Sequence, residues 1–135
     1  MSNIPYPGLQ QIGDAEWELI QNYEAVLPNK SRVYCDRGFK TDLTSSTWFG
    51  RTFGVQRASG PHIRAAFIHD ILYAAELFPR DECDDIFLEL MKEHGVGWFT
   101  RNSMYLAVRM VGGLVWRKHT AASLQHSRIF ISVVY

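Results

Sequence analysis

The sequence predicts an α+β fold built as a single domain of 135 residues. Two observations predict this class. Residues 16–36 alternate between apolar and polar side chains, as half-buried strands do. Residues 62–77, 81–94 and 100–117 carry apolar side chains at helical spacing instead. The length supports one domain, because domains most often hold about 100–150 residues.

The expected strands form an N-terminal hairpin that follows an extended arm, residues 1–13. From Trp17 to Val26 a period of two places Trp17, Leu19, Tyr23 and Ala25 on one face of a single strand. Leu27–Lys30 is a turn signal, and a second short strand follows around Val33 and Cys35. Residues 38–60 are irregular and rich in glycine, which indicates a long loop, and loops of this length are often functional.

Three helices and a tail follow the loop. Residues 62–77 are apolar nearly all round, so this helix should be central and buried. The helix over 81–94 has one apolar stripe, and Gly95 and Gly97 end it. The pair Gly112-Gly113 interrupts the helix over 100–117, which predicts either a kink or a close helix contact. Residues 128–135 favour an edge strand or contact with a partner, including a second copy of the chain.

Composition excludes some classes of function. Lys and Arg number 14, as do Asp and Glu, so no overall charge points to nucleic acid or to an anionic membrane, although a local patch stays open. No apolar run approaches the ~20 residues of a membrane span, and no secretory signal is visible. Cys35 and Cys83 form no C-x-x-C pair, so we expect two buried thiols in a reducing compartment.

The apolar helix carries two ionisable neighbours, His69 and Asp70. On a helix they point ~100° apart, so each needs its own partner. Asp84 lies at the edge of the apolar stripe of the next helix, whereas Asp85 lies opposite and should be solvated. A short turn makes the two helices antiparallel, so His69 and Asp84 should meet, with Tyr73 one turn beyond His69. A carboxylate that orients a histidine serves a general base or a metal ligand, but such a pair is also often only a satisfied polar pair of the core.

The other histidines indicate less. His94 lies on the apolar stripe of its helix and is interpreted as a core or C-terminal capping residue. His62 lies near a helix start and is expected to be solvated. Arg109 either binds an anion or pairs with a core carboxylate such as Asp70 or Asp42.

Four fragments in order resemble DUF1353, a phage- and prophage-associated domain of unknown function. They are G-F-K-T-D-L-T-S at 38–45, A-A-F-I-H-D-I-L-Y at 65–73, C-D-D-I-F-L-E-L-M at 83–91 and Y-L-A-V-R-M-V-G-G-L-V-W at 105–116. The resemblance covers about residues 17–117. Thr47 and Trp48 stand where the family pattern has Pro and Arg. The chain matches the polar positions of the family at Asp42, Ser45, His69, Asp70, Tyr73, Asp84 and Arg109.

A second likeness is to phospholipase A2 sites, in which H-D-x-x-Y on one helix faces an Asp from an antiparallel helix. That resemblance implies that His69 activates water, Asp70 holds calcium and Asp84 orients His69. The loop Gly38–Ser45 would supply oxygen ligands, which calcium prefers. The disulfides of secreted members of that class are absent.

Together these resemblances lead us to expect a phage-encoded protein with a metal-dependent, hydrolase-like site, located in the host cytoplasm or on the virion. The catalytic residues would be His69, Asp84 and Tyr73, acting on an unidentified small or polymeric substrate. The alternative is a non-catalytic phage protein that binds a host component, such as a defence system, or a virion component. The residues that would hold calcium, magnesium or zinc are Asp42, Asp70 and His69, and those that would bind substrate are Ser45 and Arg109.

Overall fold

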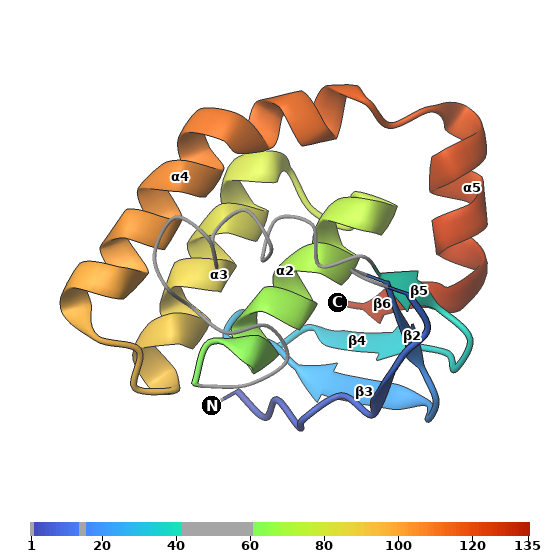
Figure 1. The fold of residues 1–135 in the computed structure, drawn as a ribbon, viewed down its shortest axis with the longest axis horizontal. Coiled ribbons are helices and arrows are strands. Elements are labelled where there is room, and N and C mark those ends of the chain that lie inside the picture. Colours follow the sequence, from blue (N-terminus) through green and yellow to red (C-terminus); the bar gives the residue numbers. More distant parts are fainter. Residues whose placement is uncertain (1, 14–15, 42–60) are drawn as a thin grey trace.

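The computed structural model describes residues 2–13, 16–41 and 61–135, and in these parts it consists of two small antiparallel sheets and four helices. Most helices lie apart from the strands, with α2 (Ile63–Ala75) between the sheets and the two helices that follow it in the chain (Figure 1). This arrangement confirms the α+β class. The expected loop 38–60 contributes β5 (Lys40–Thr41), and its residues 42–60 lie outside the described part.

The two sheets have three strands each. The first has the order β1-β2-β5 and joins β1 (Leu9–Gln11) to β2 (Trp17–Leu19) and β5. The second has the order β3-β4-β6 and joins β3 (Tyr23–Val26) to β4 (Arg32–Cys35) and β6 (Ile131–Val134). The last residues of the chain therefore complete a sheet that its first third begins.

The hairpin β3–β4 confirms the predicted strand pair. Ala25 lies opposite Val33, and both are buried, so the alternation of the sequence matches the pleat of the sheet. The predicted turn closes with Lys30 N–H donating to the carbonyl of Leu27 at 2.9 Å, and Lys30 adopts a positive φ of 72°.

The prediction of one continuous strand from Trp17 to Val26 is wrong, because β2 and β3 lie in different sheets. The ladder breaks after Leu19. Ile20 N–H donates to the carbonyl of Gly8 at 2.9 Å, and Asn22 Oδ1 accepts from the backbone of Arg37 at 2.9 Å. Asn is depleted in strands because its side chain competes for backbone groups. The period of two continues across this break, so periodicity alone did not reveal it.

The three expected helices are present with ends shifted by a few residues: α2, α3 (Arg80–Glu93) and α4 (Trp98–Arg117). All but three residues of α2 are buried, as its apolar sequence predicts. The helix α3 packs antiparallel against α2, and α4 packs antiparallel against α3 (Figure 1). The three helices thus form one layer over the sheets, with α4 at an edge of the molecule.

A fourth helix, α5 (Ala121–Phe130), was not predicted. Thr120 and Ser123 form a capping box at its start, and none of its residues is buried. The expected strand over 128–135 is right for Ile131–Val134, which pairs with β4, whereas residues 128–130 end the helix.

Both cysteines are buried and free, as the sequence predicts. Within the described residues, no helix is both long and apolar enough to cross a membrane.

Candidate functional site

The carboxylate of Asp84 is the centre of the polar cluster in the core. Its side chain is fully buried in the second turn of α3. The Nε2 atom of His69 lies 2.8 Å from Asp84 Oδ1, and the Tyr73 hydroxyl donates to the same oxygen at 2.7 Å. His69 and Tyr73 are four residues apart on α2 and therefore reach the same point. The predicted contact between His69 and Asp84 is confirmed.

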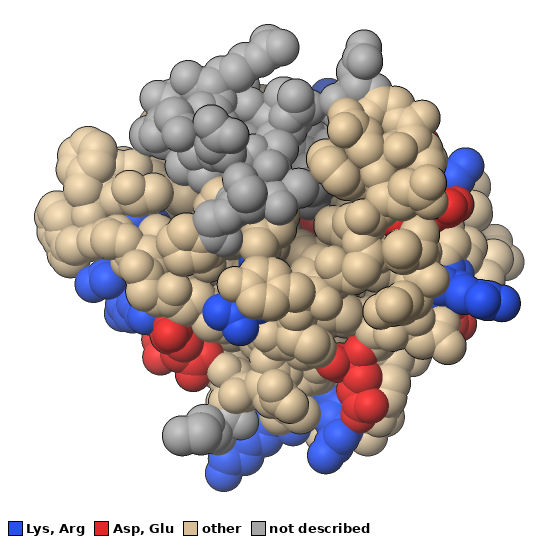
Figure 2. All heavy atoms as spheres, turned by 60° about the horizontal axis from the view of Figure 1, so that its bottom comes forward, with Lys and Arg blue, Asp and Glu red and all other residues tan. Residues whose placement is uncertain are grey.

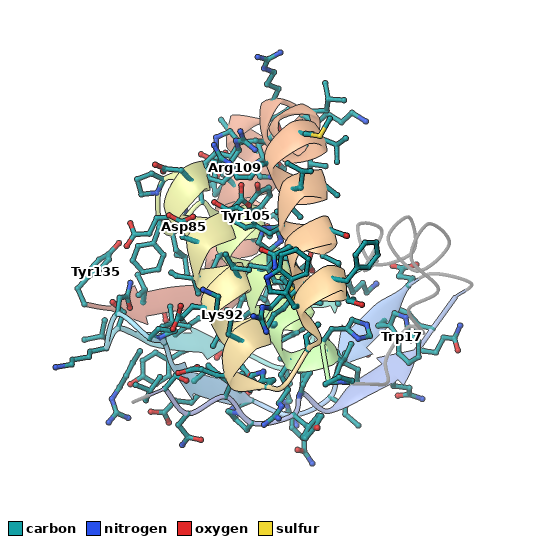
Figure 3. All side chains as sticks on the ribbon, turned by 90° about the vertical axis from the view of Figure 1, so that its left-hand side faces the viewer. Trp17, Asp85, Lys92, Tyr105, Arg109 and Tyr135 are labelled. Carbon is teal, nitrogen blue, oxygen red and sulfur yellow. The ribbon has the colours of Figure 1, made fainter. Side chains whose placement is uncertain are left out.

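The neighbouring carboxylate, Asp85, is exposed, as its position on the helix predicts. It accepts a hydrogen bond from the hydroxyl of Tyr105 at 2.7 Å. Figure 3 shows Asp85, Tyr105 and Arg109 along the seam between α3 and α4. Adjacent acids on α3 therefore serve two different contacts, one buried and one exposed.

Two arginines face the second oxygen of Asp84. Arg109 donates from Nη1 to Asp84 Oδ2 at 2.9 Å, and Nη1 of Arg80 lies 3.5 Å from the same oxygen. The prediction that Arg109 pairs with a core carboxylate is right, but its partner is Asp84 rather than Asp70 or Asp42. Arg80 was missed, although its i, i+4 spacing to Asp84 is a recognisable helical signal.

These donors determine the ionisation of the cluster. Burial by itself would raise the pKa of Asp84, but hydrogen bonds from His69, Tyr73 and Arg109 together hold this pKa below its usual value. Burial, and then the hydrogen bond to Asp84, raise the pKa of Tyr73. Asp84 is therefore an ionised carboxylate at neutral pH, and Tyr73 is a neutral donor.

The imidazole of His69 is held in one orientation. Its ring packs 4.2 Å from the ring of Tyr73 and 4.7 Å from that of Phe87, measured between centroids. Because Nε2 faces an ionised carboxylate, the neutral ring carries its proton on Nε2 and leaves the lone pair on Nδ1. This is the tautomer that a general base acting through Nδ1 requires.

Gly112 allows α4 to approach this cluster. A Cβ atom at this position would lie 2.6 Å from the hydroxyl oxygen of Tyr73 and 3.1 Å from Nη1 of Arg80. The helix continues through Gly112 and Gly113 without a break. The close contact, one of the two alternatives predicted for this glycine pair, is therefore observed at Gly112.

Comparison with known proteins assigns the family. Residues 17–108 match the family described as "Protein of unknown function (DUF1353)". The chain belongs to the DUF1353 family. His69, Asp70, Tyr73 and Asp84 of this DUF1353 domain lie inside the matched segment, and Arg109 lies one residue beyond it. No curated protein and no solved structure matches the chain. The phage origin and the phospholipase A2 likeness stay predictions.

The remaining predicted site residues of the DUF1353 domain lie apart from Asp84 or outside the described residues. Asp70 is half-buried and accepts a hydrogen bond from the Thr41 hydroxyl of β5. Asp42 and Ser45 fall within residues 42–60, which are not described. Among residues 2–13, 16–41 and 61–135, no group of three or more His, Cys, Asp or Glu side chains is placed to hold a metal ion.

Two other histidines of the domain lie at the ends of helices. His62 is buried at the N-cap of α2, so the expectation that it is solvated is wrong. His94 is the C-cap residue of α3, as one of its two interpretations predicts. Burial, and then the charge of Arg64, lower the pKa of His94.

Proposed function

We propose that this DUF1353 protein is a hydrolase in which His69 acts as a general base through Nδ1. One observation carries the proposal, namely the 2.8 Å contact between His69 Nε2 and Asp84 Oδ1. A carboxylate on the far nitrogen of a histidine sets its tautomer, fixes its orientation and stabilises the imidazolium that forms when the ring takes a proton.

The surroundings of Asp84 support this role. An orienting carboxylate has to stay ionised, and the hydrogen bonds of Tyr73 and Arg109 favour the ionised form. Tyr73 and Arg109 are positioning residues in this scheme, because both act on His69 through Asp84. In the proposed step, Nδ1 accepts a proton from water while the water oxygen attacks the carbonyl carbon of an ester, and the C=O π pair moves to the carbonyl oxygen. The tetrahedral intermediate then reforms the carbonyl and breaks its bond to the alcohol, which leaves with the proton returned by His69.

Arg109 is also placed to recognise an anionic group. One third of its side chain is exposed, and a guanidinium has five N–H donors. Only Nη1 is used in the bond to Asp84. The other donors can contact a carboxylate or phosphate of a substrate, and Ser45, which lies outside the described residues, is the second proposed substrate contact.

A divalent cation is part of the proposal, with Asp70 and Asp42 as the residues that would hold it. Their carboxylate oxygens suit hard cations, so calcium or magnesium fits better than zinc. A zinc site would also recruit His69, and binding zinc through Nδ1 would remove the base. When bound, a hard cation would polarise the carbonyl oxygen of the substrate.

A second candidate function is favoured by the enclosure of the cluster. Only 6% of His69 is exposed, and both oxygens of Asp84 already have partners. In this second function, the contacts of Asp84 with His69 and Arg109 only stabilise the packing of three helices. The protein then binds a partner without catalysis.

Hydrolysis assays with His69→Gln separate the two functions. The Gln amide can still donate to Asp84, but it offers no base at the position of Nδ1. We expect the parent protein to hydrolyse carboxylic esters or phospholipids when calcium or magnesium is present. His69→Gln should lose about 10²–10⁴-fold in kcat, which is the usual contribution of a general base.

The matched control is Asp85→Asn, which changes an exposed acid on the same helix and should retain activity. Calorimetric titration of the parent protein and of Asp70→Asn with calcium, magnesium and zinc tests the metal. If the parent hydrolyses none of these substrates with any of the three ions, while His69→Ala lowers the melting temperature, the binding protein is the better account.

A further inference from the structure

The outward side of α4 is apolar and exposed. Trp98 and Phe99 begin it, and Leu106, Met110 and Leu114 continue it at helical spacing, with exposed fractions between 59% and 73%. We call these five residues the outer stripe. The opposite side of α4 buries Met104, Ala107, Val108 and Gly112. A surface helix usually has one apolar side, so a second, exposed apolar side indicates a contact surface.

The charged residues of α4 and of the chain that follows it have one sign. From Gly95 to Tyr135 the sequence contains no Asp or Glu, although the chain has 14 such residues. The same segment contains five of the 14 basic residues. Among them, Arg117 and Lys118 are exposed at the C-terminal end of α4. The net charge of the whole chain is zero, but its C-terminal segment is basic and the rest of the chain is acidic.

One face of the protein has a mixed charge instead. The face that comes forward in Figure 2 shows Lys and Arg beside Asp and Glu, with neither sign forming a continuous field. The helix α4 lies at an edge of the molecule, beside α3 (Figures 1 and 3). An apolar stripe with basic residues and without acidic ones is typical of helices that lie in a lipid interface.

We propose that the outer stripe of α4 docks the protein onto the surface of an anionic lipid bilayer. Trp98 and Phe99 would enter the headgroup region beside Leu106, Met110 and Leu114, while Arg117 and Lys118 contact anionic headgroups. The helix lies on the bilayer rather than across it, because Arg101, Arg109 and Arg117 interrupt its apolar residues. This inference does not depend on His69 acting as a base.

A second copy of the chain fits the outer stripe less well. Two α4 helices in contact would bring only basic residues together, without an acid on either helix to pair with them. A stable protein interface also buries about 800 Å² on each partner, whereas the outer stripe consists of five side chains of one helix. A bilayer supplies the missing negative charge and accepts a narrow apolar stripe.

Vesicle flotation tests the proposal with the full chain and two lipid compositions. One set of vesicles is phosphatidylcholine alone, and the other contains phosphatidylglycerol as well. We expect binding to the phosphatidylglycerol vesicles, weaker binding to phosphatidylcholine, and a fall in binding as salt rises, because exposed charges are screened over about 8 Å at physiological ionic strength. The fluorescence of Trp98 should shift to the blue on binding, and Trp98→Phe should remove that shift.

The double variant Leu106→Asp with Met110→Asp removes the middle of the outer stripe. Both side chains are exposed, so the fold should be retained, as circular dichroism will show. We expect its partition onto phosphatidylglycerol vesicles to fall at least about tenfold, since burying one such side chain is worth about that factor or more. The matched control is Ile129→Asp, an equally exposed apolar residue of α5 within the same basic segment.

Several results would overturn the proposal. The parent protein could fail to float with either vesicle, or the double variant could bind as well as the Ile129→Asp control. Light scattering could also show that the parent is a dimer and the double variant a monomer. In that case the outer stripe is an interface between two copies of this chain and not a lipid-binding surface.

Discussion

Arg109 of α4 donates to Asp84 of α3 on the oxygen opposite the one that faces His69 of α2. One buried carboxylate therefore joins three helices. The bond to Arg109 also extends the cluster one residue beyond the segment that matches DUF1353. The helix α4, which bears the outer stripe, is one of the three.

Replacing Asp84 should therefore unfold the protein more readily than replacing any exposed acid. We expect Asp84→Ala to lower the free energy of unfolding by about 3–5 kcal/mol, because it leaves His69, Tyr73 and Arg109 without their shared acceptor. Asp85→Ala, which removes one exposed hydrogen bond, should cost less than about 1 kcal/mol. Denaturant unfolding measures both, and equal effects would contradict the assignment of Asp84 as the buried partner.

Stability should fall in acid because of the same residue. The pKa of Asp84 in the folded protein lies below its usual value, whereas in the unfolded chain it should be about 3.9. The unfolded state binds the proton first, so the contribution of Asp84 is fully present above pH ~4 and is lost as pH falls through the folded pKa. The free energy of unfolding, measured between neutral pH and pH 2 for the parent and for Asp84→Asn, checks this. If the free energy of unfolding falls in acid by the same amount in the parent and in the variant, Asp84 is not the cause of the acid sensitivity.

The glycine pair of α4 offers a matched comparison. Gly112→Ala should destabilise the protein, because the new Cβ would lie 2.6 Å from the hydroxyl oxygen of Tyr73. Gly113→Ala should stabilise it by up to about 1 kcal/mol, since the nearest atom is 3.9 Å away and Ala favours a helix interior. Thermal melts measure both variants. If both melting temperatures shift in the same direction, the contact with Tyr73 does not restrict position 112 to glycine.

The two thiols should be unreactive in the folded protein. Burial raises the pKa of Cys35 and of Cys83 to about 12 each, so little thiolate is present at pH 8. Iodoacetamide at pH 8 should label neither residue in the native state and both in denaturant. Mass spectrometry of the labelled peptides measures this, and rapid native labelling of Cys35 would indicate that β4 opens beside β6.

Much of the site could be predicted because it depends on local spacing. His69 and Tyr73 share a face of α2 since they are four residues apart, and the apolar stripe of α3 turns Asp84 inward and Asp85 outward. A short connection then forces the two helices to be neighbours. Each of these steps involves residues close in sequence, where helical geometry leaves few alternatives.

The sequence by itself determined the α+β class, the hairpin, the three main helices and the choice of Asp84 over Asp85. Only the tertiary structure decided that Arg109 pairs with Asp84, that β2 and β3 belong to different sheets, that His62 is buried, and that β6 returns to β4. Periodicity reports which side of an element is apolar. It contains no information on which distant element covers that side, because that choice depends on how the whole chain packs.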